Sequence, residues 1–171
     1  MTLSELKKFI INKTVPTEFM IFVAKDCPFL ASQYLQAICD MSKSGCRKIN
    51  SIYEPQQSSL ALLTSPEDVI NILKVEVFDE RAEEYSQFEN TIVVCEQVSK
   101  DIAKNVENYI IKFPKLTDWQ ICDYAKTLCP HVEESELMWL VQASDNSIER
   151  VLNELDKEAV YEDILNFLSL N

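Results

Sequence analysis

The sequence predicts an α/β domain with a mainly parallel, five-stranded sheet flanked by helices, followed by a small all-helical bundle. Five apolar runs of strand length alternate with helix-sized segments in the first part of the chain, an alternation that is typical of parallel sheets. These runs are residues 18–24, 49–53, 71–78, 91–95 and 109–113. From Pro114 onward the apolar residues recur at helical spacing instead. We therefore expect two domains, residues 1–113 and residues 114–171.

The first domain is expected to begin with a helix and a buried strand. Thr2 and Glu5 form the T-x-x-E pattern of a capping box, and the apolar residues that follow fall on one face of a helix. Residues 18–24 (EFMIFVA) are continuously apolar, which favours a central strand covered on both faces. A turn then leads into a predicted helix over residues 29–41.

The loop after this first strand lacks the composition of a phosphate-binding loop. It reads AKDCPFLAS, with no glycine and no Lys-Ser/Thr pair. Loops that cradle phosphates need several glycines because their backbone must approach the ligand closely. The whole chain holds one glycine, Gly45. We therefore expect no nucleotide cofactor and no phosphate-binding role for Lys25.

Residues 114–171 predict a bundle of three or four helices. Thr117 and Gln120 form a second capping box, and the segment from residue 118 to residue 129 carries an apolar stripe at helical spacing. Pro130 is expected to end this helix.

The rest of the bundle follows from the same spacing. A second helix is expected over residues 133–143, with Trp139 packed into the bundle. Asp145 or Asn146 is expected to cap a third helix. Apolar residues recur once more at 160–170, which predicts a last helical segment.

The sequence shows no catalytic or metal-binding set. Its six cysteines lie inside apolar patterns, so reduced and mostly buried thiols are expected rather than disulfides. The closest spacings, Cys39 to Cys46 and Cys122 to Cys129, are wider than those with which zinc sites usually begin, and His131 is the only histidine. We expect no catalytic residues, no metal ligands and no enzymatic activity.

Net charge argues against direct binding of nucleic acid. The chain carries −12, with 8 Lys+Arg against 10 Asp+Glu in residues 1–80 and 8 against 18 in residues 81–171. Affinity for DNA comes largely from basic side chains that displace counterions, so DNA would be contacted only through partners. No apolar run approaches the roughly 18 residues of a membrane span, and no signal peptide opens the chain. We expect a cytoplasmic protein without membrane contacts.

A leucine-rich segment remains open to two interpretations. Residues 54–66 read EPQQSSLALLTSP, in which Leu60, Leu62 and Leu63 follow a polar run and precede a proline. These leucines form either a short helix facing the core or an exposed docking element.

Residues 90–158 resemble a known family. The segments VSKDIAK, KFPKL, WQICDYAK and DNSIERVLNELDK match, in this order, motifs of the delta subunit of bacterial and phage DNA polymerase III clamp loaders. The resemblance implies an AAA+-like domain without a functional phosphate loop, followed by a helical lid. Members of the family continue into a collar domain, so the resemblance also implies that this chain corresponds to the N-terminal part of such a subunit.

The resemblance further implies a binding role. The segment QSSLAL with the adjoining Leu63 is similar to a bacterial clamp-binding peptide, which implicates Gln57, Leu60, Leu62 and Leu63 in contacts with the sliding clamp. The other implied partners are the remaining clamp-loader subunits. The lopsided charge supports an alternative, an acidic interaction module that binds a basic partner or mimics DNA.

Overall fold

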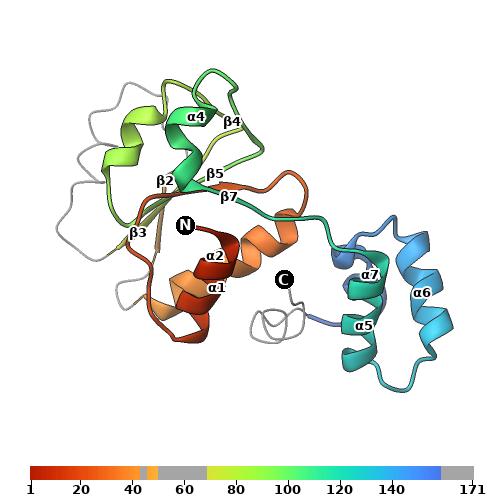
Figure 1. Ribbon diagram of the computed structural model, residues 1–171. Coiled ribbons are helices and arrows are strands. Elements are labelled where there is room, and N and C mark those ends of the chain that lie inside the picture. The colour runs from red at the N-terminus through yellow and green to blue at the C-terminus, as the bar shows by residue number, and fades with distance from the viewer. Residues whose placement is uncertain (43–45, 50–68, 159–171) are drawn as a thin grey trace. The chain divides into compact units, whose positions relative to one another are not determined.

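The computed structural model describes residues 1–42, 46–49 and 69–158 (Figure 1). The chain divides into two compact units, Met1–Phe113 and Pro114–Asn171. The division falls where the apolar spacing of the sequence changes from strand runs to helical stripes.

The first unit is built on a parallel sheet with the strand order β2-β3-β5-β1-β7. Its strands are β1 (Met20–Val23), β2 (Cys46–Ile49), β3 (Ile70–Lys74), β5 (Thr91–Cys95) and β7 (Ile110–Lys112). In the register of β1, Ile21 lies opposite Val93 on one side and Ile110 on the other. The predicted α/β class, with a mainly parallel sheet flanked by helices, is confirmed.

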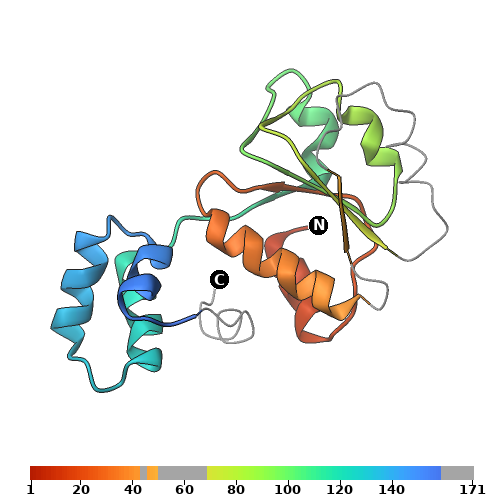
Figure 2. The ribbon, with the colours of Figure 1, turned by 180° about the vertical axis from the view of Figure 1, so that it is seen from behind.

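Helices cover both faces of this sheet, as the two opposite views show (Figures 1 and 2). Two α-helices lie on one face, and a 3₁₀ helix and a short α-helix lie on the other. The first pair is α1 (Leu3–Ile11) and α2 (Pro28–Met41), and the second is η1 (Glu83–Gln87) and α4 (Ala103–Val106). A further 3₁₀ turn, η2 (Glu107–Tyr109), leads from α4 into β7.

The apolar cores on the two faces use alternate residues of the same strands. Ile21 of β1 packs in a buried cluster that includes Tyr85 of η1. The next residue, Phe22, points the other way, and its ring centroid lies 4.9 Å from that of Phe113, which in turn lies 5.4 Å from the ring of Tyr34 on α2. The uninterrupted apolar run of β1 is explained because both of its faces are covered.

The capping box predicted at the start of α1 is present. Thr2 Oγ1 accepts a hydrogen bond from the Glu5 amide at 3.2 Å, and Glu5 Oε2 accepts one from the Thr2 amide at 3.1 Å. These bonds satisfy two amides that the helix itself leaves without partners. The buried residues of the helix are Leu6 and Ile10.

The predicted strand at 71–78 is in fact two strands in different sheets. β3 ends at Lys74, and β4 (Val77–Phe78) pairs with β6 (Gln97–Val98) in a separate two-stranded parallel sheet. The Glu76 carbonyl accepts hydrogen bonds from the amides of Glu96 and Gln97 at 3.0 and 3.4 Å. The segments that follow β3 and β5 therefore stay paired after both have passed the end of the large sheet. The polar and apolar residues keep alternating across this break, which is why the pattern alone suggested one strand.

The second strand and the cysteines also differ from expectation. β2 begins at Cys46 rather than at Ile49, and residues 50–53 lie outside the described part of the chain. Cys46 forms a disulfide with Cys39, so the prediction of six reduced thiols is wrong. The Cα atoms of Cys39, on α2, and Cys46, at the start of β2, lie 5.4 Å apart, a separation that suits a disulfide. Of the cysteines in the described residues, Cys27, Cys95, Cys122 and Cys129 form no disulfide.

The second unit contains three described helices that all contact one another. They are α5 (Asp118–Leu128), α6 (Glu134–Ala143) and α7 (Ile148–Glu154). The last predicted segment, residues 160–170, lies outside the described residues. Across residues 1–42, 46–49 and 69–158, no helix combines the length and apolar character that crossing a bilayer requires.

The helix caps of this unit were predicted in one case and missed in another. Thr117 and Gln120 form the expected capping box of α5. The cap of α7 is Ser147, whose hydroxyl accepts from the Arg150 amide at 3.3 Å, and not Asp145 or Asn146. Those two residues have φ values of 54° and 60° and form the left-handed turn before the helix, whereas a cap residue needs extended backbone.

Candidate functional site

The residues predicted to contact a clamp cannot be placed in three dimensions. Gln57, Leu60, Leu62 and Leu63 all fall within residues 50–68, outside the described part of the chain. The strands that precede and follow these four residues show only which connection of the sheet contains them. The connection that contains them runs from the end of β2 to the start of its parallel neighbour β3.

The loop between β1 and α2 occupies the position at which a nucleotide-binding domain would hold phosphate. The Ala24 amide donates to the Cys95 carbonyl at 2.9 Å, which ties the loop to the neighbouring strand. Pro28 is the first residue of α2 and has no N–H to offer. Residues 24–28 include neither glycine nor a residue with positive φ, so they do not form the concave row of amides that binds anions. These residues do not fit a nucleotide phosphate.

Burial raises the pKa of several thiols and phenols in the described chain. Burial raises the pKa of the Cys95 thiol to about 12 and that of the Tyr34 phenol to about 12. The pKa of Cys122 is also raised, first by burial and then by nearby carboxylates such as that of Glu134. A thiol that stays protonated at neutral pH is a poor nucleophile.

The described residues contain no grouping that suits a metal ion. His131 is exposed in the connection between α5 and α6. Cys122 is buried, and its thiol donates to the Glu134 carbonyl at 3.8 Å. Within residues 1–42, 46–49 and 69–158, no three His, Cys, Asp or Glu side chains come together as ligands.

The most unusual surface of the described chain is aromatic and lies on the second unit. Trp119, in the first turn of α5, is 61% exposed, and Trp139, in the middle of α6, is 70% exposed. They are the chain's two tryptophans. The expectation that Trp139 packs into the bundle is therefore wrong. Large aromatic side chains left in water are typical of contact surfaces, where tryptophan is enriched.

The geometry of α6 explains why Trp139 points outward. The helix turns by about 100° per residue, so a residue two positions from another lies on nearly the opposite side. Leu137 and Val141, the buried residues of α6, are each two positions from Trp139. Both therefore place Trp139 on the face turned away from the bundle. The sequence contains this signal, because the spacing of Leu137 and Val141 excludes Trp139 from their stripe.

Two hollows meet at Trp139. The first, of about 540 Å³, lies between the tryptophans and is also lined by Glu134, Ser135 and Met138. The second, of about 490 Å³, is lined by the same Trp139 and Ser135 and by apolar residues that include Leu140 and Leu155. Because the hollows share two residues, they form one continuous surface. We call it the tryptophan surface; its apolar members are Trp119, Met138, Trp139, Leu140 and Leu155.

The surroundings of the tryptophan surface are acidic. Residues 114–158 hold ten Asp and Glu against four Lys and Arg. Glu134 lines the first hollow and Glu136 the second. In the part of the chain that the structure describes, neither carboxylate forms an ion pair with a lysine or an arginine.

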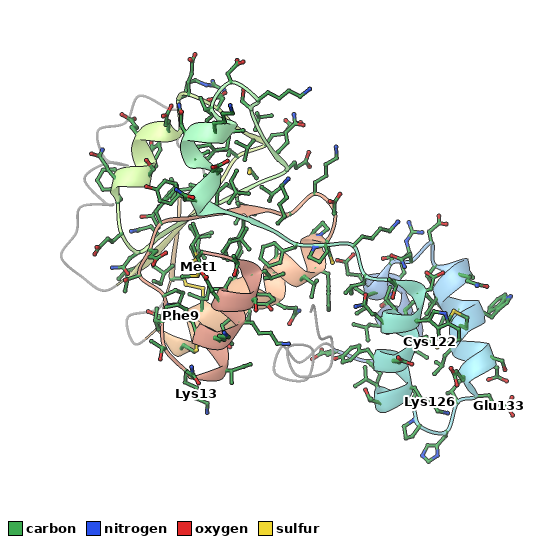
Figure 3. The ribbon with its side chains drawn as sticks, in the orientation of Figure 1. Met1, Phe9, Lys13, Cys122, Lys126 and Glu133 are labelled. Atoms are coloured by element: carbon green, nitrogen blue, oxygen red, sulfur yellow. A yellow bond between two sulfur atoms is a disulfide. The ribbon has the colours of Figure 1, made fainter. Side chains whose placement is uncertain are left out.

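The lysine nearest in sequence to Glu134 and Glu136 is Lys126, and its ammonium group binds backbone carbonyls instead of these carboxylates. The Lys126 ammonium donates to the carbonyls of Pro130 and Val132, at 3.2 and 2.5 Å, and so binds the connection between α5 and α6. Figure 3 shows Lys126 toward the end of α5 and Glu133 at the start of α6. The acidic character of this face is therefore not neutralised by Lys126.

Comparison with known proteins assigns the chain to no family. No family model matches the chain, and no curated protein matches it. The class that the structure defines is an α/β domain with a parallel sheet and covered faces, followed by a compact helical unit.

Proposed function

We propose that the chain is a clamp-loader subunit of the delta type, which binds the DNA sliding clamp and helps to open it during DNA replication without catalysing a reaction itself. The observation that carries the proposal is the order of the strands. Numbered along the chain, the strands of the large sheet lie in the order second, third, fourth, first, fifth. A parallel sheet with its first strand between the fourth and the fifth supports the AAA+-like fold that the proposal requires.

The β1–α2 loop supports the same proposal. A delta-type subunit keeps the nucleotide-binding fold without hydrolysing ATP. The loop from Ala24 to Pro28 supports the proposal, because it holds neither glycine nor a left-handed residue and because Pro28 offers no amide at the helix start. The helical unit adds further support: α5 begins at Asp118, shortly after β7 ends at Lys112, as a lid would.

The clamp-binding element of the proposal is the segment of Gln57, Leu60, Leu62 and Leu63. Full burial of one leucine contributes roughly 1.5 to 3 kcal/mol. Three leucines could therefore supply on the order of half or more of the approximately −8 kcal/mol of a micromolar complex. This is sufficient for docking on an apolar pocket of the clamp.

Opening the ring makes a further demand. A ligand that binds the closed and the open clamp equally well does not shift the equilibrium between them. Leu62 and Leu63 would enter the pocket of the clamp, while the neighbouring residues from Ser59 onward press on the adjacent ring interface. The subunit must therefore bind more tightly to the opened clamp than to the closed one.

The test is complex formation with the sliding clamp of the same replication system, measured by size-exclusion chromatography with light scattering. The wild-type chain should form a complex that survives moderate salt, because leucine docking is not screened. The double variant Leu62→Ala/Leu63→Ala should bind at least about a hundredfold more weakly, since roughly 3 kcal/mol of apolar contact is lost.

The matched control is Ile11→Ala, which removes an apolar side chain that is 57% exposed on α1. It should bind the clamp as the wild type does. Wild-type affinity in the double leucine variant would show that the leucines are wrongly assigned. Absence of a complex at both low and moderate salt would overturn the proposed function itself, and steep loss of binding with salt would favour an acidic module instead.

A further inference from the structure

The tryptophan surface is a second candidate for binding, and it is separate from the proposed clamp contact, which lies in the first unit. We propose that this surface binds a basic amphipathic helix of a partner protein. The apolar residues of that helix would lie against Trp139 and its neighbours, and its lysines or arginines would face Glu134 and Glu136.

The apolar part of the argument is the exposure of the two tryptophans. Trp119 and Trp139 are 61% and 70% exposed, and neither belongs to the buried core that the described residues of the second unit form. A tryptophan offers roughly 150 to 250 Å² for burial, so covering both would remove a large apolar area from water. Such residues often contribute most of the affinity of an interface.

The spacing of the residues that line the first hollow indicates what kind of element would bind there. Ser135, Met138, Trp139 and Gln142 line the first hollow. Their positions on α6 follow the pattern i, i+3, i+4, i+7, which is one continuous stripe along two turns of a helix. A stripe of this kind is the surface against which a second helix packs its own ridge.

Charge decides among the possible occupants. Residues 114–158 carry ten acidic and four basic residues, and two unpaired glutamates lie on the surface itself. Residues 159–171 of the same chain contain two acidic residues and no basic one. A second copy of the chain would bring a net charge of −12. Both would meet like charge, whereas a basic partner is complementary.

The experiment uses the full chain and a synthetic 18-residue helix of leucine and lysine in amphipathic order. Two control peptides separate the contributions: the same leucines with glutamate in place of lysine, and the leucine and lysine residues in scrambled order. Because the peptides contain no tryptophan, the protein's emission reports on Trp119 and Trp139 alone. Affinity is measured by calorimetry at low and moderate salt.

We expect the amphipathic basic peptide to bind and to shift the emission to shorter wavelength, as the tryptophans leave water. Its affinity should fall with salt, because part of it is electrostatic. Trp139→Ala should weaken binding at least about tenfold. Ile11→Ala and the Leu62→Ala/Leu63→Ala variant should bind the peptide as the wild type does, so failure here is distinct from failure of the clamp proposal.

Three results would overturn the inference. Equal binding of the glutamate peptide or of the scrambled peptide would exclude the stated partner chemistry. Undiminished binding by a Trp119→Ala/Trp139→Ala variant of unchanged circular dichroism would exclude the site. Binding by a chain that ends at Glu158, together with no binding by the full chain, would show that residues 159–171 occupy the surface.

Discussion

Replacement of Thr117 by alanine should destabilise the second unit and leave the first unchanged. Thr117 Oγ1 accepts from the Gln120 amide at 3.2 Å, and Gln120 Oε1 accepts from the Thr117 amide at 2.8 Å. Alanine removes the first bond and leaves an amide of the first turn of α5 without its partner. The loss of such a cap costs on the order of 1 kcal/mol in the free energy of unfolding.

The expected shift of the melting temperature follows from the size of the unit. A domain of about 60 residues unfolds with an entropy of about 2.1 cal/mol/K per residue, so 1 kcal/mol corresponds to roughly 8 °C. Thr117→Ser keeps the hydroxyl and should melt close to the wild type.

Tryptophan fluorescence isolates the unit of interest. Trp119 and Trp139 are the chain's tryptophans, and both lie in the second unit, whereas far-ultraviolet circular dichroism reports on both units. Thr2→Ala removes the equivalent capping box of α1 in the first unit and is the matched control. Thr117→Ala should move the fluorescence transition, and Thr2→Ala should move only the transition seen by circular dichroism.

Two results would refute this reasoning. An unchanged fluorescence midpoint in Thr117→Ala would mean that the capping box does not stabilise α5. An equal fluorescence shift in Thr2→Ala would mean that the two units unfold together.

Two further predictions concern the first unit. Cys95 and Tyr34 have pKa values of about 12 when folded, against ordinary values of 9.0 and 10.0. The unfolded chain therefore releases these protons first, and stability that is complete below about pH 9 should be lost as the pH rises toward 12; a constant melting temperature over that range would contradict this. The Cys39–Cys46 disulfide closes a loop with a sequence separation of 7. Chain entropy assigns it roughly 2.5 kcal/mol, so a Cys39→Ser/Cys46→Ser variant should melt earlier by circular dichroism with no change in its fluorescence transition.

Local signals in the sequence were sufficient where the structure depends on neighbours along the chain. Both capping boxes, at Thr2 and at Thr117, are present. The wholly apolar run at 91–95 is a strand with those same bounds. Each of these features can be predicted from a few consecutive residues. The change at Pro114 from strand-length apolar runs to helical spacing can be predicted in the same way.

Features that depend on distant parts of the chain were not predictable from pattern. The division of residues 71–78 into β3 and β4 is set by the Glu76 carbonyl, which bonds to amides some twenty residues away. The pairing of Cys39 with Cys46 depends on where α2 ends relative to β2. The same is true of the candidate sites: the leucine motif was found by resemblance, but the tryptophan surface required the positions of α5 and α6 together.

The hydrogen bond between Asn146 and Asp118 has a consequence for the chemical ageing of the protein. Asn146 Nδ2 donates to Asp118 Oδ1 at 2.7 Å and so fastens the turn before α7 to the first turn of α5. Hydrolysis of this side-chain amide, a common lesion of stored proteins, would replace the donor with a second carboxylate. Two carboxylates at this distance repel each other unless one binds a proton. Protein deamidated at Asn146 would lose this hydrogen bond and gain one negative charge. Ion-exchange chromatography would separate it from the unmodified protein.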